Sequence, residues 1–276
     1  MSKISFSVCM SVYERDRAEY FGIAVESIYH RQTLKPDEIV LVVDGPVPED
    51  IMSEVSRLEH EIPVLKVICK KKNEGHAVAR QTAIDAATHE IIAIMDSDDI
   101  SKENRFELQM NYLQRHPDVA VVGGQIMEFT GEGKIVGRRN VPVDDNDIKR
   151  YMKSRCPMNH MTVMFRKSMI NNIGGYIDWY CEEDYYLWIR MALAGYTFAN
   201  MEEVLVDVRV DDNLYGRRGG WRYFRSELRI QRFMRDNGMI NIMRMWVNVM
   251  VRFVTQVLMP KKFRALMFKS LFRQKP

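Results

Sequence analysis

The stretch IIAIMDSDD, residues 91–99, decides how this sequence folds. Its first five residues form an apolar run typical of a buried strand, and the carboxylates of Asp96, Asp98 and Asp99 follow at once. Like charges at the end of a buried strand are costly unless a cation or a basic partner neutralises them. Because ligands bind outside the carboxyl ends of strands in open α/β sheets, the cluster predicts a divalent cation that holds a phosphorylated ligand. The alternative is that one of these residues only caps a helix near Asn104.

Short apolar runs alternate with helical patterns on both sides of this stretch, which is the order of βαβ units. We expect strands at residues 4–12, 38–43, 65–69, 91–95, 119–124 and 161–165, and helices at residues 18–30, 49–60, 75–87 and 104–115. Asn73 is the expected cap of the third helix, a hairpin is expected around residues 131–133, and residues 182–184 open a later helix. The pattern predicts an α/β fold with a mainly parallel central sheet flanked by helices. Neither a G-x-G-x-x-G after the first strand nor a P-loop occurs.

Charge divides the 276 residues into two parts. Residues 217–276 contain fifteen Lys and Arg against Glu227 and Asp236, so this tail carries +13 and the 216 residues before it carry −10. The hydrophobic content of 46% and the charged content of 28% are those of an ordinary globular protein. An acidic body joined to a basic, apolar tail implies a division of tasks.

The cysteines and the N-terminus indicate where the protein works. The four cysteines are widely separated and form no C-x-x-C pair, so we expect reduced thiols in a cytoplasm rather than a zinc site or a disulfide framework. The first residues lack the apolar core of a signal peptide, and no apolar run is long enough to predict a membrane span. Nucleic-acid-binding motifs are absent, so no nucleic acid partner is expected, and nothing in the sequence indicates an oligomeric state.

The tail has its own pattern. Four polar residues recur at every fourth position in an otherwise apolar stretch: Arg244, Asn248, Arg252 and Gln256. On a helix they form a narrow polar stripe and leave a broad apolar face, and beyond Pro260 basic residues alternate with apolar ones. Residues 216–276 are therefore predicted to form a basic amphipathic helical tail that associates with an anionic membrane surface. The alternative is a pair of helices packed on the preceding domain or on a second subunit.

Five stretches match one known family in order and spacing: VCMSVY (8–13), EIVLVVDGP (38–46), NEG followed by AR (73–80), MDSDD (95–99) and EDYYLW (183–188). Together they resemble the inverting family 2 glycosyltransferases, which have the GT-A fold. The likeness implies a GT-A catalytic domain over residues 1–215, with a nucleotide-binding half at about 1–100 and an acceptor-binding half at 101–215. The wording SVY, DGP and RRGG (217–220) more narrowly resembles bacterial enzymes of O-antigen, capsule and exopolysaccharide synthesis.

This resemblance implies a metal-dependent, inverting transfer of a hexose, galactose or glucose, from a UDP-sugar. The acceptor would be a polyprenyl-diphosphate-linked saccharide, GlcNAc-diphosphate-undecaprenol, and the new linkage would be β. The protein would then be cytoplasmic and bound peripherally to the inner face of the bacterial plasma membrane. Two alternatives are a sugar nucleotidyltransferase, which needs a basic glycine-rich loop that residues 11–14 do not supply, and a non-catalytic membrane-associated scaffold with a degenerate nucleotide site.

On the donor side, the resemblance implies that Asp98 ligates Mn²⁺ or Mg²⁺, while Asp96 contacts the ribose. Asp96 and Asp99 are further candidates for the metal, and Asp99 could instead hold the loop. Hard cations prefer the carboxylate and phosphate oxygens that such a site offers. Asp44 would accept a hydrogen bond from the uracil or ribose, and Arg80 would reach the base or the diphosphate unless it pairs with a rim aspartate.

Further donor contacts are implied at the start and end of the domain. Ser11, Tyr13 and Glu14 would frame the nucleotide base. Arg217 and Arg218 combine two fixed cations with a flexible backbone, which suits a loop that orders over a diphosphate. The alternative for this pair is a basic linker.

On the acceptor side, Asp184 is the expected catalytic base. Inversion needs a carboxylate opposite the leaving group, where it takes the proton of the attacking hydroxyl. Glu183 would orient the acceptor or tune Asp184, since adjacent helical carboxylates point in different directions. Asn159 and His160 are candidates for an acceptor or diphosphate contact, although a lone histidine beside an apolar strand is more often a structural hydrogen-bonding residue.

Overall fold

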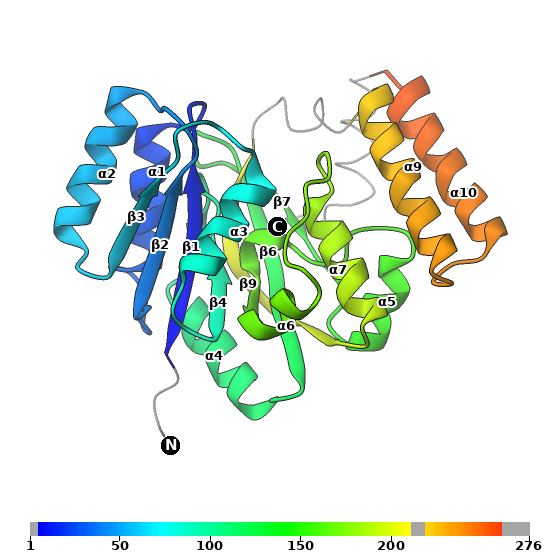
Figure 1. The fold of residues 1–276 in the computed structure, drawn as a ribbon, viewed down its shortest axis with the longest axis horizontal. Coiled ribbons are helices and arrows are strands. Elements are labelled where there is room, and N and C mark those ends of the chain that lie inside the picture. Colours follow the sequence, from blue (N-terminus) through cyan, green and yellow to red (C-terminus); the bar gives the residue numbers. More distant parts are fainter. Residues whose placement is uncertain (1–4, 211–218, 261–276) are drawn as a thin grey trace.

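One sheet organises the chain in the computed structural model, which describes residues 5–210 and 219–260 (Figure 1). The strands are β1 (Phe6–Val12), β2 (Glu38–Val43), β3 (Leu65–Cys69), β4 (Ile91–Ile94), β5 (Ile100–Ser101), β6 (Val119–Phe129), β7 (Ile135–Arg139), β8 (Met164–Arg166) and β9 (Thr197–Arg209). Their order is β3-β2-β1-β4-β8-β6-β9-β5, with β7 paired to β6. The first four strands are parallel, and antiparallel pairs enter beyond β4. The predicted α/β fold is confirmed.

Helices cover both faces of this sheet. They are α1 (Ala18–Ile28), α2 (Glu49–Glu61), α3 (His76–Ala86), α4 (Arg105–Arg115), α5 (Asp145–Met152), α6 (Lys167–Asn172), α7 (Glu183–Leu193), α9 (Trp221–Asp236) and α10 (Ile242–Arg252), with a 3-10 turn η1 (His160–Thr162) and a π-helical turn η2 (Phe253–Leu258). Side chains alternate across a strand, so Ile91 and Ala93 of β4 pack with α1, α2 and α4, while Ile92 and Ile94 pack with α3 and α7.

Several elements begin or end where the sequence pattern predicts. Strands β2 and β3 have the predicted bounds, and the hairpin of β6 and β7 turns at the expected glycines. Asn73 was the expected cap of α3, but this prediction is wrong because Gly75 occupies the N-cap position. Gly75 has a φ of 91°, a backbone conformation that favours glycine and lets the chain enter the helix abruptly.

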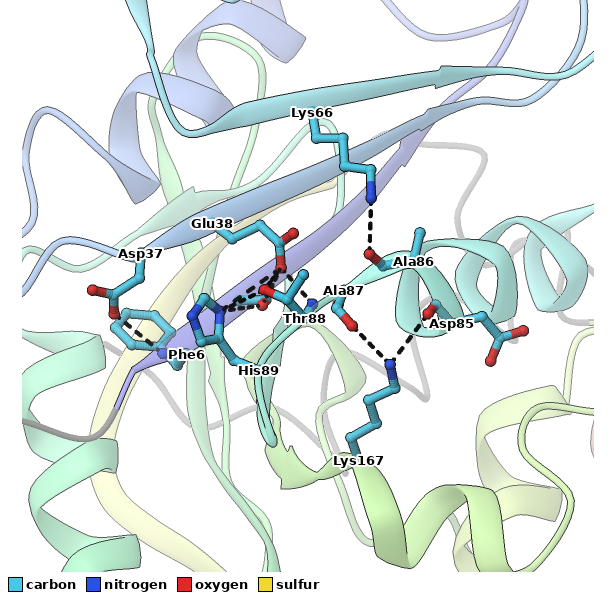
Figure 2. Close-up of polar contacts among 11 residues, drawn as sticks. Phe6, Asp37, Glu38, Lys66, Asp85, Ala86, Ala87, Thr88, His89 and Lys167 are labelled. Atoms are coloured by element: carbon cyan, nitrogen blue, oxygen red, sulfur yellow. Dashed lines mark hydrogen bonds and ion pairs between the residues drawn. The ribbon is translucent and has the colours of Figure 1, made fainter.

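A polar network closes the sheet at the end opposite the acidic cluster (Figure 2). The carboxylate of Glu38 accepts hydrogen bonds from the hydroxyl of Ser7 at 2.6 Å and from the backbone N–H of Thr88 at 2.8 Å. Although burial opposes it, this bonding holds the pKa of Glu38 below its usual value. Lys66 and Lys167 donate to the last carbonyls of α3, where cations stabilise a helix. This end of the sheet is therefore occupied by structural contacts.

The described part of the predicted tail packs on the rest of the chain. Helices α9 and α10 lie side by side next to α7 (Figure 1), and the backbone N–H of Gly220 before α9 donates to the carbonyl of Gln256 after α10. Phe224 and Val249 belong to the same apolar cluster as Trp188 of α7. Among the described helices, none combines the length and the apolar character that crossing a bilayer requires.

Candidate active site

The acidic cluster lies at the carboxyl end of β4, and Arg80 of α3 joins it to the start of α7. Its guanidinium bonds to Oδ1 of Asp96 at 3.1 Å and to Oε1 of Glu183 at 2.9 Å. The side chain of Arg80 is only 12% exposed, so both ion pairs are shielded from water. Residues that the sequence predicted for the donor and acceptor sides are thus connected through a single cation.

Asp99 ties the acidic loop to β9. It is 2% exposed, and its Oδ1 accepts a hydrogen bond from the backbone N–H of Arg209 at 2.9 Å. Burial and the neighbouring carboxylates raise the pKa of Asp99 well above its usual value. The helix-capping alternative is wrong, because Asn104 is the N-cap of α4 and no side chain caps that helix.

Asp98 is the member of the cluster whose surroundings would favour a bound cation. Its side chain reaches solvent, yet desolvation, then Asp96, then Asp16 raise its pKa to about 6. Among the described residues no group of three or more potential ligands gathers closely enough to hold a metal ion alone. Magnesium-type sites often use one or two carboxylates and complete their coordination with substrate phosphates. The oxygen donors of this loop fit a cation of that kind.

A buried carboxylate also organises the nucleotide side. Asp44 is 3% exposed and accepts hydrogen bonds from the backbone N–H groups of Glu74 and Gly75, both at 3.0 Å. Gly45 has a φ of 90°, and a Cβ there would lie 2.4 Å from the backbone nitrogen of Asn73. The glycine lets the two loops touch, so Asp44 fixes the start of the helix that carries Arg80.

The residues after β1 surround the same edge. Tyr13 donates its backbone N–H to Asp16 at 2.9 Å, and its ring lies edge-on to His76 with centroids 5.8 Å apart. Ser11 is half-buried at the end of β1. Glu14 is exposed and lies 3.7 Å from its neighbour Arg15. Ser11 and Tyr13 are therefore less exposed at this edge of the sheet than Glu14.

Asp184 lies in the first turn of α7, where carboxylates are favoured by the helix dipole. Its Oδ1 accepts the backbone N–H of Tyr185 at 2.7 Å, and Sγ of Cys156 lies 3.7 Å from its Oδ2. Glu183 points instead to Arg80, so the two carboxylates have separate surroundings as helix geometry requires. Cys181, just before the helix, has a φ of 57°, which is uncommon for a residue with a side chain.

Asn159 and His160 are both buried. Nδ2 of Asn159 donates to the carbonyl of Gly124 at 2.8 Å, a contact that supports β6. Nε2 of His160 lies 2.7 Å from the hydroxyl of Tyr176. Burial and the nearby Arg80 lower the pKa of His160 well below its usual value, so the imidazole is neutral. Asn159 therefore makes a structural contact, whereas His160 also lines the cavity that contains Asp184.

A cavity of about 350 Å³ lies between α7, the segment before η1, and the helix pair α9 and α10. Asp184, His160, Arg139, Arg155 and Arg252 are among the residues that line it. A hydroxyl that enters this cavity meets the predicted base. Arg217 and Arg218, predicted for the donor diphosphate, lie outside the described residues.

The sequence pattern missed several residues of the site. Asp16 lies among the acidic residues, Cys156 touches Asp184, and Arg105 is fully buried beneath the end of β4. Arg105 donates to the carbonyl of Ile94 at 2.8 Å and brings a positive charge close to the aspartates. Only Asp16 had a local signal, a carboxylate three residues after the first strand's motif, because the other contacts arise from distant segments.

Comparison with known proteins decides the family. Residues 7–173 match the model of glycosyl transferase family 2, and residues 91–272 match glycosyl transferase family group 2. The chain belongs to glycosyltransferase family 2. This family 2 glycosyltransferase is 35% identical to the amylovoran biosynthesis glycosyltransferase AmsE of Erwinia amylovora, over 96% of this chain and 98% of that one. It is 32% identical to an Escherichia coli UDP-Gal:alpha-D-GlcNAc-diphosphoundecaprenol beta-1,3-galactosyltransferase, over 98% of this chain and 97% of that one.

Solved structures agree on the fold of this family 2 glycosyltransferase. TarS of S. aureus in complex with UDP-GlcNAc superposes with a TM-score of 0.65 at 16% identity, covering 91% of this chain and 73% of that one. The mannosyltransferase PcManGT of Pyrobaculum calidifontis, solved with GDP-Man and Mn²⁺, gives 0.59 at 16% identity, covering 98% and 70%. The predicted GT-A fold and glycosyltransferase class are confirmed. This family assignment favours the enzyme over the nucleotidyltransferase and the scaffold.

Proposed function

We propose that this glycosyltransferase transfers a hexose, galactose or glucose, from a UDP-sugar to a GlcNAc-diphosphate-polyprenol, with inversion and a β linkage. The observation that carries the proposal is the position of Asp184, which lines a cavity and is joined to the donor-side cluster through Glu183 and Arg80. The galactosyltransferase from Escherichia coli, similar over nearly its whole length, supports the donor and acceptor classes. The product would belong to a bacterial surface polysaccharide.

Asp184 would act as the catalytic base. Its carboxylate takes the proton of an acceptor hydroxyl as that oxygen bonds to the anomeric carbon of the donor sugar. The bond from the anomeric carbon to the donor phosphate oxygen breaks, and the nucleoside diphosphate leaves with the electron pair. Attack from the face opposite the leaving group gives inversion. Glu183 holds Arg80 in place and keeps the two halves of the site together.

The donor would lie over the carboxyl ends of β1, β2 and β4. Asp98 would hold Mn²⁺ or Mg²⁺, with Asp96 and Asp99 beside it. That cation would neutralise charge on the departing diphosphate. Asp44, Ser11, Tyr13 and Glu14 would line the nucleotide, and Arg217 with Arg218 would close over its diphosphate.

The protein would bind peripherally to the anionic inner face of the plasma membrane. Helix α10 buries its polar residues Asn248 and Arg252, which are 6% and 9% exposed, against α9 and the loop after α5. It presents apolar side chains to solvent instead, including Met243 at 75%, Trp246 at 57% and Met250 at 56%. The neighbouring helix α9 has five exposed arginines: Arg222, Arg225, Arg229, Arg232 and Arg235. An apolar face on a basic pair of helices suits an anionic lipid surface.

One assay tests the reaction. Purified protein is incubated with a panel of UDP-sugars, a GlcNAc-diphosphate-alkyl acceptor, and either Mn²⁺ or a chelator, and the product linkage is determined by NMR. We expect transfer of one hexose in a β linkage with Mn²⁺ and a loss of at least 100-fold with chelator.

The Asp184→Asn variant identifies the base. It should lose transfer by about 10²–10⁴-fold, the usual contribution of a general base, while its affinity for the UDP-sugar stays unchanged. Asp147→Asn, which alters an aspartate in the first turn of α5 that does not line the cavity, is the matched control and should retain transfer. Full turnover by Asp184→Asn would refute the assignment of the base.

A further inference from the structure

One wall of the cavity is formed by residues 154–156, which connect Asp184 to α10 through their contacts. Cys156 touches Oδ2 of Asp184 at 3.7 Å, and Nη2 of Arg139 donates to the carbonyl of Cys156 at 3.4 Å. Two residues earlier, the carbonyl of Ser154 accepts from Nη2 of Arg252 at 2.6 Å. Arg139 therefore lies beside the base, and Arg155, between Cys156 and Ser154, lies toward α10.

Three arginines line this cavity beside three carboxyl groups: Arg139, Arg155 and Arg252 with Glu182, Asp184 and Glu227. Arg252 is paired with Glu227 at 2.5 Å, and both side chains are nearly buried, at 11% and 9% exposure. Burial, and next Glu227, raise the pKa of Glu182 well above its usual value, which opposes a negative charge at this carboxyl. Arg139 and Arg155 bring two further positive charges to the same cavity. Guanidinium groups bind phosphate oxygens in a bidentate manner, which suits a diphosphate.

The mouth of the cavity adjoins the apolar face of α10. Val251 lines the cavity and is also 56% exposed on that face. A lipid-linked sugar whose chain lies along α10 would enter here. Its diphosphate would then meet Arg155 before its sugar reaches Asp184, because Arg155 follows Ser154, which bonds to Arg252 of α10, and precedes Cys156, which contacts Asp184. Arg139, bonded to the carbonyl of Cys156, would meet the diphosphate nearer to Asp184.

We propose that Arg139 and Arg155 form the subsite for the diphosphate of the lipid-linked acceptor. The assignment rests on the proposed function, since it takes the acceptor to be diphosphate-linked. The donor also contains a diphosphate, but its expected place is on the opposite side of Arg80, near Asp98. When UDP saturates the donor site, binding of a second diphosphate compound reports on the acceptor subsite alone.

Binding of octyl diphosphate tests the subsite without any sugar transfer. Titration calorimetry is carried out on the full chain with saturating UDP and Mn²⁺, using Arg139→Gln, Arg155→Gln and the double variant. We expect about tenfold weaker binding in each single variant and no measurable binding in the double variant. Arg150→Gln is the control, because Arg150 is 77% exposed on α5 and pairs with Asp147; its binding should match the wild type.

Kinetics give a second readout. For the GlcNAc-diphosphate-alkyl acceptor, KM should rise about tenfold in the single variants while kcat changes little. For an octyl glycoside of GlcNAc, which lacks phosphate, the variants and the wild type should have the same KM. Thermal unfolding of each variant checks that it remains folded.

Two results would overturn the subsite: octyl diphosphate binding that survives in the double variant, or displacement of octyl diphosphate by UDP. Failure of the proposed function looks different. In that case the wild type binds octyl diphosphate through the two arginines and yet transfers no hexose to the GlcNAc acceptor.

Discussion

At the scale of single residues, Arg80 links the cluster predicted to bind the donor to the helix predicted to carry the base. Burial disfavours its charge, but Asp96 and Glu183 outweigh this and raise its pKa, so the guanidinium stays protonated. Without Arg80, the carboxylates of Asp96 and Glu183 would have no cation between them. The pairing with a rim aspartate, which the sequence left as an alternative, is what the structure contains.

Replacing this cation should therefore affect both halves of the site. Arg80→Gln leaves two partly buried carboxylates without their ion pairs, which should lower the free energy of unfolding by about 1–3 kcal/mol. Transfer should fall at least tenfold, with effects on both kcat and the KM for donor. Urea denaturation and steady-state kinetics measure these changes. Arg57→Gln removes a half-buried arginine of α2 that pairs with three carboxylates, those of Glu26, Glu54 and Glu61. This control should change stability by less than 1 kcal/mol.

The sequence identifies those site residues that belong to a local motif. Asp98 follows an apolar strand and Asp184 opens a helical pattern, so their motifs could be read directly. Cys156 and Arg139 have no such motif, and they reach Asp184 only because β7 and the loop after α5 fold back beside α7. Contacts of this kind depend on the packing of distant segments, which periodicity does not encode.

At the scale of elements, α10 has its polar and apolar faces reversed. The sequence predicted a narrow polar stripe and a broad apolar face, and left open whether lipid or protein covers the latter. The structure buries Asn248 and Arg252 of the stripe and leaves the apolar face exposed, while Arg244 of the same stripe remains exposed. Nδ2 of Asn248 donates to Oε1 of Gln231 at 2.8 Å, and Arg252 pairs with Glu227. Polar contacts thus hold α10 on α9.

Breaking the buried pair should detach α10. Arg252→Met leaves Glu227 buried without its cation, so the free energy of unfolding should fall by about 3–5 kcal/mol. The double variant Arg252→Met/Glu227→Leu should recover most of this loss, because both charges are gone. Chemical denaturation of the single and double variants measures the difference. Equal destabilisation in both would mean that the pair does not hold the helix.

How well each element could be predicted depends on how regular its sequence pattern is. The strands β2 and β3 show clear apolar runs between turn residues, and they were placed correctly. The 13 residues of β9 include exposed Glu202 and Glu203, and its pairing with β6 shifts register, so no period of two survives. Helix α5 has only 8 residues and buries two of them, too few for a helical repeat to appear.

At the scale of the whole molecule, exposed basic residues and exposed apolar residues occur together in the helix pair α9 and α10. Helices α9 and α10 lie side by side at one end of the molecule (Figure 1). Helix α9 has exposed arginines, and α10 has exposed apolar side chains. Val251 of α10 also lines the cavity that contains Asp184. Under the proposed function, Asp184 would therefore lie within reach of an acceptor whose lipid chain stays in the bilayer.

Membrane binding should depend on the apolar face. The triple variant Met243→Ser/Trp246→Ser/Met250→Ser should lose most sedimentation with vesicles of phosphatidylglycerol and phosphatidylethanolamine, since it removes the largest exposed apolar side chains. Its transfer to a soluble acceptor should remain. The control Ile135→Ser/Ile177→Ser/Leu193→Ser alters side chains that are 39–49% exposed elsewhere and should sediment normally. Unchanged sedimentation of the first variant, or a change only in its oligomeric state, would argue for a protein partner instead.

The reversed polarity of α10 also has an evolutionary consequence. Under the proposed membrane binding, the outward positions, such as Met243 and Val247, would meet fluid lipid chains that accept many shapes, and they would need only to remain apolar. The inward positions Asn248 and Arg252 must keep particular hydrogen-bonding atoms at fixed distances. Among relatives of this protein, the polar columns of this helix should therefore be the invariant ones and the apolar columns should drift, the reverse of what an ordinary surface helix shows.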